Sequence, residues 1–392
     1  MSVPELSELL SILLFLAAWI GHGYVLMLTL NVIYSRPFHR KFLKALRLVC
    51  GLLLVGGPPL FATLVGFDLI ALGQRALADG SYLIPTAYAW ICVLLGGIAF
   101  PAVTVYRLLR GNPKIVRDER TETVDVAKEL GGRPVGDGKH RHLARKAFLD
   151  LFNVEFTTLT LAVPGLPATW DGLSILHLSD FHFFGTPGRD YFEFVVRRCM
   201  ADGVPDVLVL SGDFIDDDRY LDWIEPVFGP LRWNAAAFAI LGNHDWWQDF
   251  DAIRERLAGL NLRVISNRWE AVDVRGERLV AIGHEGPWFR PAPDLAGCPD
   301  GFWLLVSHTP DNIGWARQHD CRLMLSGHNH GGQIRVPIFG SLFVPSRYSR
   351  RYDAGTFHEP PTILHVTRGL SGKEPLRLLC RPQVSRLVLR PG

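Results

Sequence analysis

The stretch SILHLSDFH, residues 174–182, decides the fold, because a short apolar run ends there in a polar Asp-x-His. A continuous apolar run bounded by polar residues predicts a strand that is buried on both faces. Four later runs have the same form: VLVLSGD (207–213), AFAILGNHD (237–245), FWLLVSH (302–308) and LMLSGHNHGG (323–332). Buried strands of this kind predict an α/β protein with an open sheet covered by helices.

The polar side chains follow the predicted strands, where the loops of an α/β sheet converge on one crevice. They comprise carboxylates, imidazoles and one amide: Asp180, His182, Asp213, Asn243, His308, His328 and His330. Mixed oxygen and nitrogen donors without Cys suit Mn, Fe or Zn better than a closed structural zinc site or an all-oxygen calcium site. These ligands exceed the needs of one ion, so the sequence predicts two divalent metal ions that share a carboxylate.

The order of these motifs resembles the calcineurin-like metallophosphoesterases. The shared pattern is Asp-x-His (180–182), Gly-Asp (212–213), Gly-Asn-His-Asp (242–245), a lone His (308) and Gly-His-x-His (327–330). Each motif alone would be weak, but five in this order are specific. The glycine-rich runs at 331–334 and 368–372 resemble the bacterial membrane-associated branch. The resemblance implies a β-sandwich flanked by helices, a four-layer α/β/β/α arrangement, over residues 151–392.

The resemblance also implies a role for each residue of the motifs. One ion would be bound by Asp180, His182, Asp213 and His330, and the other by Asp213, Asn243, His308 and His328, with Asp213 as the bridge. A water that bridges the ions would lose a proton and attack phosphorus. His244 would protonate the leaving group as general acid, and Asp245 would orient it. His177, inside its strand, is interpreted as a packed core residue.

Three nearly uncharged runs precede this region, at residues 9–35, 48–67 and 80–106. Each reaches the roughly 20 apolar residues that a helix needs to cross a bilayer. They account for a mean hydropathy of +0.15 in a chain of 392 residues. Buried helices of a soluble core are the alternative, as is a cleaved signal peptide for the first run, but Glu5 and Glu8 replace a signal's cations. We therefore expect an α-helical transmembrane region over residues 1–110.

Cations fill the first connection between these runs and the segment after the third run: Arg36, Arg40, Lys41, Lys44, Arg47, Arg107, Arg110, Lys114 and Arg117. The positive-inside rule then predicts a multi-pass protein of the cell membrane whose catalytic domain is cytoplasmic. Gly56-Gly57-Pro58-Pro59 leaves open whether residues 48–67 span or form a re-entrant segment, and the sidedness with it. His22, in the first run, is interpreted as a residue packed between helices.

Residues 111–150 are polar, contain several turn signals and predict a linker, whose basic part (139–146) faces either anionic head groups or solvent. The net charge of +2 provides no field to recruit nucleic acid, so none is expected as a partner. Six scattered cysteines without a CxxC pair predict reduced thiols. Two charged groups are interpreted as solvated loop residues: Asp216 to Asp218, and Arg347, Arg350 and Arg351.

These observations predict a membrane-anchored hydrolase that cleaves a phosphodiester or pyrophosphate bond, with a phosphate-ester substrate linked to a lipid or a nucleotide. Anchoring favours a lipid-linked substrate, because it confines enzyme and substrate to one surface. Hydrolysis of UDP-2,3-diacylglucosamine, which membrane-tethered members of the family perform, is a more specific alternative. A catalytically silent, membrane-coupled binding domain is the alternative from another class, and its site should have lost at least one ligand.

Overall fold

The computed structural model describes residues 3–146 and 148–392, and for residues 3–5 it describes the backbone only. The chain forms two compact units. The helical unit comprises Met1–Gly111 and Pro337–Arg347, and the sheet unit comprises Asn112–Val336 and Tyr348–Gly392. The excursion of residues 337–347 into the helical unit, called here the 337–347 segment, was not expected from the sequence.

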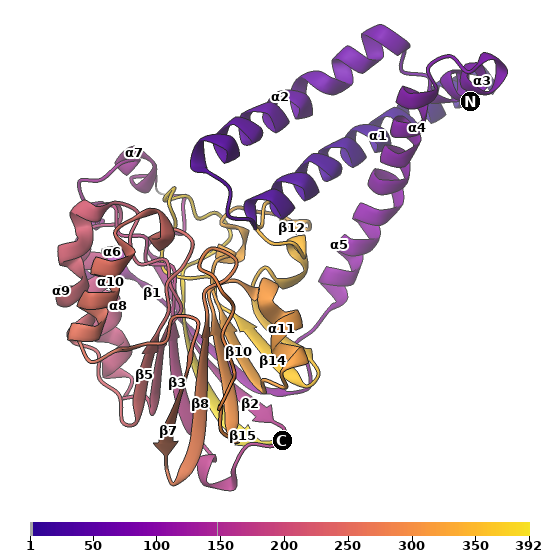
Figure 1. Cartoon of the computed structure of the whole chain (residues 1–392). Helices are drawn as coiled ribbons and strands as arrows, with labels where there is room; N and C mark the ends of the chain where they lie inside the picture. The colour runs from indigo at the N-terminus through magenta and orange to yellow at the C-terminus, as the bar shows by residue number, and fades with distance from the viewer. Residues whose placement is uncertain (1–2, 147) are drawn as a thin grey trace. The chain divides into compact units, whose positions relative to one another are not determined.

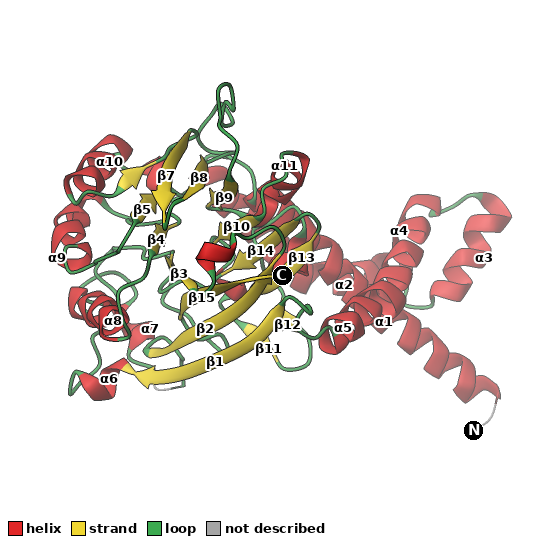
Figure 2. Ribbon diagram, turned by 90° about the horizontal axis from the view of Figure 1, so that it is seen from below, coloured by secondary structure: helices red, strands yellow, loops and turns green. Residues whose placement is uncertain are grey.

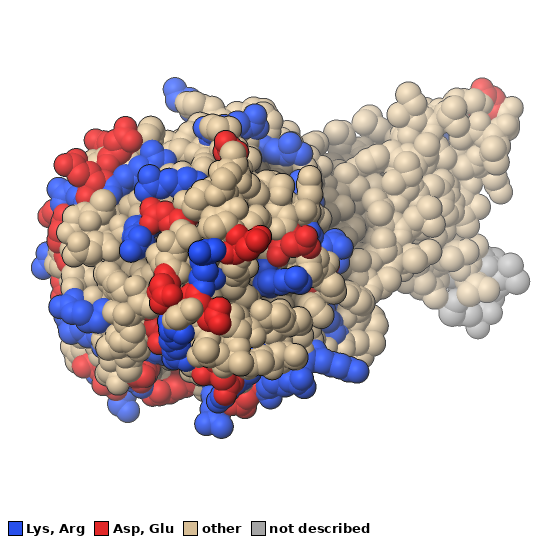
Figure 3. Space-filling view, turned by 60° about the horizontal axis from the view of Figure 1, so that its bottom comes forward, with Lys and Arg blue, Asp and Glu red and all other residues tan. Residues whose placement is uncertain are grey.

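The helical unit contains five α-helices within the described residues (Figure 1). They are α1 (Val3–Tyr34), α2 (Arg40–Val65), α3 (Leu69–Asp79), α4 (Leu83–Leu94) and α5 (Phe100–Leu109), with a π-helical turn (Leu95–Ala99) joining the last two. Three stretches are long and apolar enough to cross a membrane: Leu6–Tyr34, Arg40–Val65 and Leu83–Leu109. In the space-filling view their side chains are almost all uncharged (Figure 3). Helix α2 continues through the Gly-Gly-Pro-Pro run, which therefore does not break it.

A side chain of α1 compensates for one of the two prolines inside α2. Because proline has no N–H, the carbonyls one turn earlier lose their helical partners. Trp19 Nε1 donates to Leu54 O at 3.2 Å, and His22 Nε2 lies 3.0 Å from the neighbouring Leu53 O. His22 Nδ1 lies 2.6 Å from Tyr88 Oη on α4. His22 thus joins α1, α2 and α4, in keeping with its interpretation as a packed residue.

The sheet unit contains two large sheets that lie face to face (Figures 1 and 2). The first has the order β1-β2-β15-β3-β4-β5-β6 and the second β13-β14-β10-β9-β8-β7. The strands of the first are β1 (Val116–Asp125), β2 (Asn153–Val163), β3 (Leu173–Leu178), β4 (Val207–Leu210), β5 (Ala236–Ala239), β6 (Arg263–Val264) and β15 (Gln383–Pro391). Those of the second are β7 (Trp269–Val274), β8 (Glu277–His284), β9 (Phe302–Ser307), β10 (Leu323–Ser326), β13 (Gly355–Glu359) and β14 (Thr362–Val366). Two short strands complete the set in the described residues: β11 (Arg335–Val336) in the sheet unit and β12 (Gly340–Ser341) in the 337–347 segment of the helical unit.

Helices cover the outer faces of the two sheets (Figure 2). Those of the sheet unit are α6 (Val126–Glu129), α7 (Arg141–Ala144), α8 (Arg189–Ala201), α9 (Ile224–Phe228), α10 (Phe250–Gly259) and α11 (Ile313–Gln318). Buried side chains alternate along the strands, so that Val207 and Val209 of β4 pack between the sheets while Leu208 and Leu210 pack under α8, α9 and α10. A third core lies between the second sheet and α11. The predicted four-layer α/β/β/α sandwich is confirmed.

The segment expected to be a polar linker contains a strand. Residues Val116–Asp125 form β1, which pairs antiparallel with β2 at the edge of the first sheet. Eight of its ten side chains are exposed and most are polar or charged. An edge strand with both faces in solvent has no apolar alternation, so hydrophobic patterning does not reveal it.

Candidate metal centre

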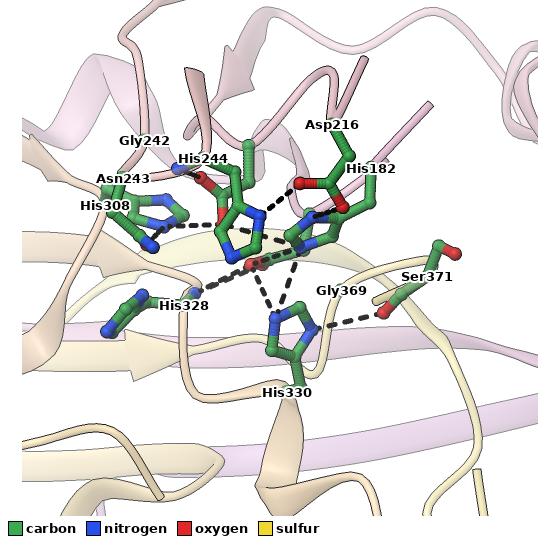
Figure 4. Close-up of polar contacts among 12 residues, drawn as sticks. His182, Asp216, Gly242, Asn243, His244, His308, His328, His330, Gly369 and Ser371 are labelled. Atoms are coloured by element: carbon green, nitrogen blue, oxygen red, sulfur yellow. Dashed lines mark hydrogen bonds and ion pairs between the residues drawn. The ribbon is translucent and has the colours of Figure 1, made fainter. Parts of the chain in front are cut away.

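The turns that follow the strands hold the predicted ligands in a strained backbone conformation. Five of them have a positive φ: Asp180 (58°), His182 (50°), Asp213 (57°), His328 (68°) and His330 (49°). A left-handed conformation of a residue other than glycine costs about 1–3 kcal/mol and persists only where the surroundings enforce it. Here the turns enforce it on one another, since the N–H groups of Phe181 and His182 both donate to Asp213 O. The strain aims side chains from separate strands into one centre (Figure 4).

The first group of possible ligands consists of Asp180, His182, Asp213 and His330, whose ligand atoms lie within 4.8 Å of one another. His182 Nε2 lies 3.4 Å from Asp213 Oδ2 and 3.3 Å from His330 Nε2. His330 Nδ1 donates to the carbonyl of Ser371 at 3.1 Å (Figure 4). That hydrogen bond fixes the tautomer and leaves Nε2 to face the centre, the arrangement typical of a metal-binding histidine.

The second group consists of Asp213, His308 and His328, so the two groups share Asp213. His308 Nδ1 donates to Ser211 O at 2.7 Å, and its Nε2 faces Asp213 Oδ2 at 3.2 Å and Asn243 Oδ1 at 3.1 Å. All of these side chains are buried. The structure therefore brings together all seven predicted ligands.

The chemistry of this centre fits bound cations. Asp213 Oδ2 is buried, accepts no hydrogen bond of good geometry in the described part of the chain, and faces the imidazole nitrogens of His182 (3.4 Å) and His308 (3.2 Å). Burial lowers the pKa of His308, but the Asp213 carboxylate outweighs it and raises that pKa to about 9. The imidazole is therefore protonated beside the Asp213 carboxylate, whose negative charge is stabilised by a nearby positive charge. A bound divalent ion would supply that positive charge.

A third group, formed by His182, Asp216 and His244, corrects two sequence-based interpretations. Asp216 is almost completely buried, and its carboxylate bonds His244 Nδ1 and lies 3.2 Å from His182 Nδ1 (Figure 4). Burial opposes its ionisation, but the two imidazoles hold the pKa of Asp216 well below its usual range. Asp216, expected in solvent, therefore has the orienting contact with His244 that the sequence assigned to Asp245.

Asp245 instead bonds backbone. Its carboxylate accepts the N–H groups of Asp213, Phe214, Ile215 and Gly242. The Asp at the end of Gly-Asn-His-Asp thus stabilises the turns and does not contact the His244 ring through any hydrogen bond in the described residues. The sequence offered one signal for Asp216, namely its place three residues after Asp213 in an acidic run.

Residues between β14 and β15 complete the centre and escaped the sequence analysis. Arg377 is 1% exposed and donates to the carbonyls of His330 (3.1 Å), Arg368 (2.9 Å) and Ser371. Ser371 O is also the acceptor for His330 Nδ1, so Arg377 holds the group that orients this histidine. Gly369 packs its backbone against the side chain of Asp180. The run 368–372 was noted for its glycines, but nothing in its pattern names these partners.

Other predicted positions fall outside the centre. His177 is buried and bonds Ser211 Oγ at 2.8 Å, which agrees with a packing role. Arg350, expected in solvent, is 3% exposed and lies in the 3₁₀ turn Ser349–Tyr352. Asp217 bonds Arg219, as expected of a loop residue.

Comparison with known proteins agrees with this geometry. A family model described as calcineurin-like phosphoesterase matches residues 173–332. Phosphodiesterase YaeI of Escherichia coli (strain K12) is 32% identical over 55% of this chain and 81% of the relative. A transmembrane protein with metallophosphoesterase domain from Bos taurus is 29% identical over 60% of this chain and 56% of the relative. UDP-2,3-diacylglucosamine pyrophosphatase LpxG of Chlamydia trachomatis serovar D is 25% identical over 58% of this chain and 87% of the relative.

The α/β/β/α sandwich and the acidic and histidine side chains at its strand ends define a hydrolase of phosphoester bonds whose His and Asp cluster could hold divalent metal. The chain belongs to the calcineurin-like phosphoesterase family.

The contact between Gly369 and Asp180 gives a test of the centre that does not depend on activity. A Cβ at Gly369 would lie 2.4 Å from Asp180 Cβ, so Gly369→Ala should displace this ligand and weaken Mn²⁺ binding at least about tenfold in calorimetry. Gly131→Ala is the matched control, because Gly131 has nearly the same φ (+70° against +68°) but nothing within 4 Å. Equal Mn²⁺ affinity in the two variants would contradict the assignment of Asp180.

Proposed function

We propose that the protein is a membrane-anchored phosphoesterase that uses two divalent metal ions to hydrolyse a phosphodiester or pyrophosphate bond. The observation that carries the proposal is the pair of ligand groups that share Asp213. Asp180, His182 and His330 would complete one ion's ligands, and Asn243, His308 and His328 the other's. A carboxylate has two oxygens, so Asp213 suits the bridging position. A complete ligand set argues against a catalytically silent binding domain.

Divalent ions bound there would supply Lewis acidity and lower the pKa of water beside the phosphoryl group. The chain's own residues would position the ligands and exclude water from the centre. Asp213 lies at the centre with both carboxylate oxygens buried. The centroid of the Trp288 ring lies 6.0 Å from that of His308 and 4.9 Å from that of His328, so this ring covers both histidines. Neutral Asn243 lies where a further carboxylate would weaken the attraction for the phosphoryl oxygens.

His244 would act as general acid. Its side chain is 15% exposed, more than those of His182 and His308, and its Nδ1 bonds the Asp216 carboxylate. The contact with Asp216 engages Nδ1, so Nε2 would be the nitrogen that passes a proton to the departing oxygen. The ring of Trp247, 5.3 Å from that of His244, would flank the leaving group.

The apolar helices support a lipid-linked substrate on the cytoplasmic side of the membrane. They would confine the enzyme to the surface on which such a substrate resides. Cations at the α1–α2 connection and after α5 support a cytoplasmic location for those ends under the positive-inside rule. The name of LpxG favours UDP-2,3-diacylglucosamine as a specific candidate, and a nucleotide-linked or other lipid phosphodiester fits the same geometry.

Loss of the bridging carboxylate should abolish hydrolysis. With added Mn²⁺ we expect the full chain in detergent to cleave bis-p-nitrophenyl phosphate, and Asp213→Asn to lower kcat/KM roughly a thousandfold, because the metals lose their shared anion. Asp206→Asn, at the opposite end of β4, is the matched control and should retain activity, since the Asp206 carboxylate bonds Ser174 and Arg275 and none of the candidate ligands in the described residues. A wild-type chain as inert as Asp213→Asn across several metals would refute the enzyme proposal.

The role of His244 predicts a dependence on the leaving group. His244→Ala should slow hydrolysis of a diester with an alkyl leaving group about a hundredfold or more, because the alkoxide needs a proton. The same variant should slow bis-p-nitrophenyl phosphate hydrolysis much less, because p-nitrophenolate departs without protonation. Asp216→Asn should show the same pattern to a smaller extent. Equal losses on both substrates would assign His244 to binding and not to acid catalysis.

A further inference from the structure

The 337–347 segment belongs to the helical unit, whereas the chain on both sides of it belongs to the sheet unit. It begins soon after His330, following β11, and the chain re-enters the sheet unit at Tyr348. The chain therefore leaves the sheet unit soon after a candidate metal-binding motif and joins a set of apolar helices.

Asn31 fixes the segment to α1. Its side chain is fully buried, donates from Nδ2 to Leu342 O at 3.2 Å, and accepts the Val344 N–H at Oδ1 at 2.9 Å. A side-chain amide in an apolar helix is costly unless both of its polar ends are bonded. The segment supplies a backbone partner for each end, so its position on α1 is specified.

Aromatic contacts extend this attachment to both α1 and α5. The rings of Tyr34 and Phe343 meet edge to face with centroids 5.2 Å apart. Phe339 stacks on Phe100 of α5 at 5.4 Å. Such pairs are typical of specific packing and not of a loop that happens to pass nearby.

The segment lies at the helix ends that carry cations. Arg107, in the last turn of α5, donates to Ser341 Oγ at 3.3 Å. Tyr34, the last residue of α1, donates to Leu43 O of α2 at 2.9 Å and so places the Arg- and Lys-rich connection beside the segment. Tyrosine and cations at the ends of apolar helices are typical of the boundary between membrane and water.

Three large apolar side chains of the segment remain exposed: Ile338 (69%), Phe339 (40%) and Phe343 (38%). In water such a cluster is unfavourable, whereas at the boundary between head groups and acyl chains it is favourable, and nearby cations add attraction to anionic lipids. We propose that these three side chains insert into that boundary of the bilayer, so that the 337–347 segment is a second membrane attachment of the sheet unit, besides the chain after α5.

The attachment has a consequence for the candidate metal centre. Because the segment follows His330 so closely in sequence, the chain that leaves the turn of this candidate ligand leads directly to the proposed attachment. Insertion of the segment into the bilayer boundary does not require that the protein hydrolyse a phosphoester.

The depth of Ile338 tests the proposal. The full chain is reconstituted in nanodiscs containing phosphatidylglycerol, with a nitroxide at Ile338→Cys, and relaxation by oxygen and by a water-soluble nickel complex is measured. Leu52→Cys, 64% exposed on α2, is the reference for the bilayer interior, and Val204→Cys, 43% exposed in the sheet unit, is the reference for water. The unsubstituted chain corrects for labelling of native cysteines.

We expect the label at 338 to be accessible to oxygen, to be shielded from nickel several-fold more than the label at 204, and to lie shallower than the label at 52. Nickel access equal to that at 204 would overturn the proposal. Protection from both reagents would also overturn it, because protein, either a second copy or the sheet unit, would then cover the segment. Asn31→Leu combined with Ile338→Cys should move the label toward water, and an unchanged depth would refute the role of Asn31. Neither readout requires catalysis, so failure here is distinguishable from failure of the proposed function.

Discussion

The buried carboxylate of Asp245 holds together the two turns on which the candidate metal centre depends. One oxygen accepts the N–H groups of Phe214 and Ile215, and the other accepts those of Asp213 and Gly242, at 2.8–3.1 Å. Hydrogen bonds to a charged group contribute about 1.5–3 kcal/mol each, enough to offset the strain of a left-handed residue. The turn after β4 is therefore locked to the turn after β5, and Asp213 can stand between both ligand groups.

The same logic operates on the other side of the centre. Arg377 bonds three carbonyls from two loops, and one of them, Ser371 O, orients His330. A buried guanidinium with no carboxylate among its hydrogen-bond partners in the described residues is costly, and the carbonyls compensate for lost water. One buried anion and one buried cation thus organise backbone around the centre, and the motif residues between them are held at fixed positions. The candidate ligands keep a left-handed backbone conformation because the turns beside them are held by these hydrogen bonds.

A structural feature could be predicted from the sequence where a local pattern of residues indicates it, and could not where it depends on residues from other parts of the chain. The sandwich and the gathering of the seven candidate ligands could be predicted, because each apolar run ends in a side chain whose chemistry a core does not need. Asp216 could not, since its burial comes from His182 and His244, which other loops contribute. Arg377 could not either, because its partners are backbone carbonyls. Likewise the 337–347 segment has little apolar length, and its place is specified by Asn31, more than 300 residues earlier.

Strand β1 has a consequence for how copies of the protein coexist. An anchored protein shares one plane and one orientation with its neighbours, which raises the frequency at which exposed sheet edges meet. The edge that β1 offers carries Arg117, Asp118, Glu119, Arg120 and Glu122, nearly all solvated. Pairing of two such edges would strip water from a row of charged side chains, so this border of the sheet resists strand-to-strand association. The polar sequence that prevents hydrophobic patterning from revealing β1 also disfavours edge-to-edge pairing between neighbouring copies.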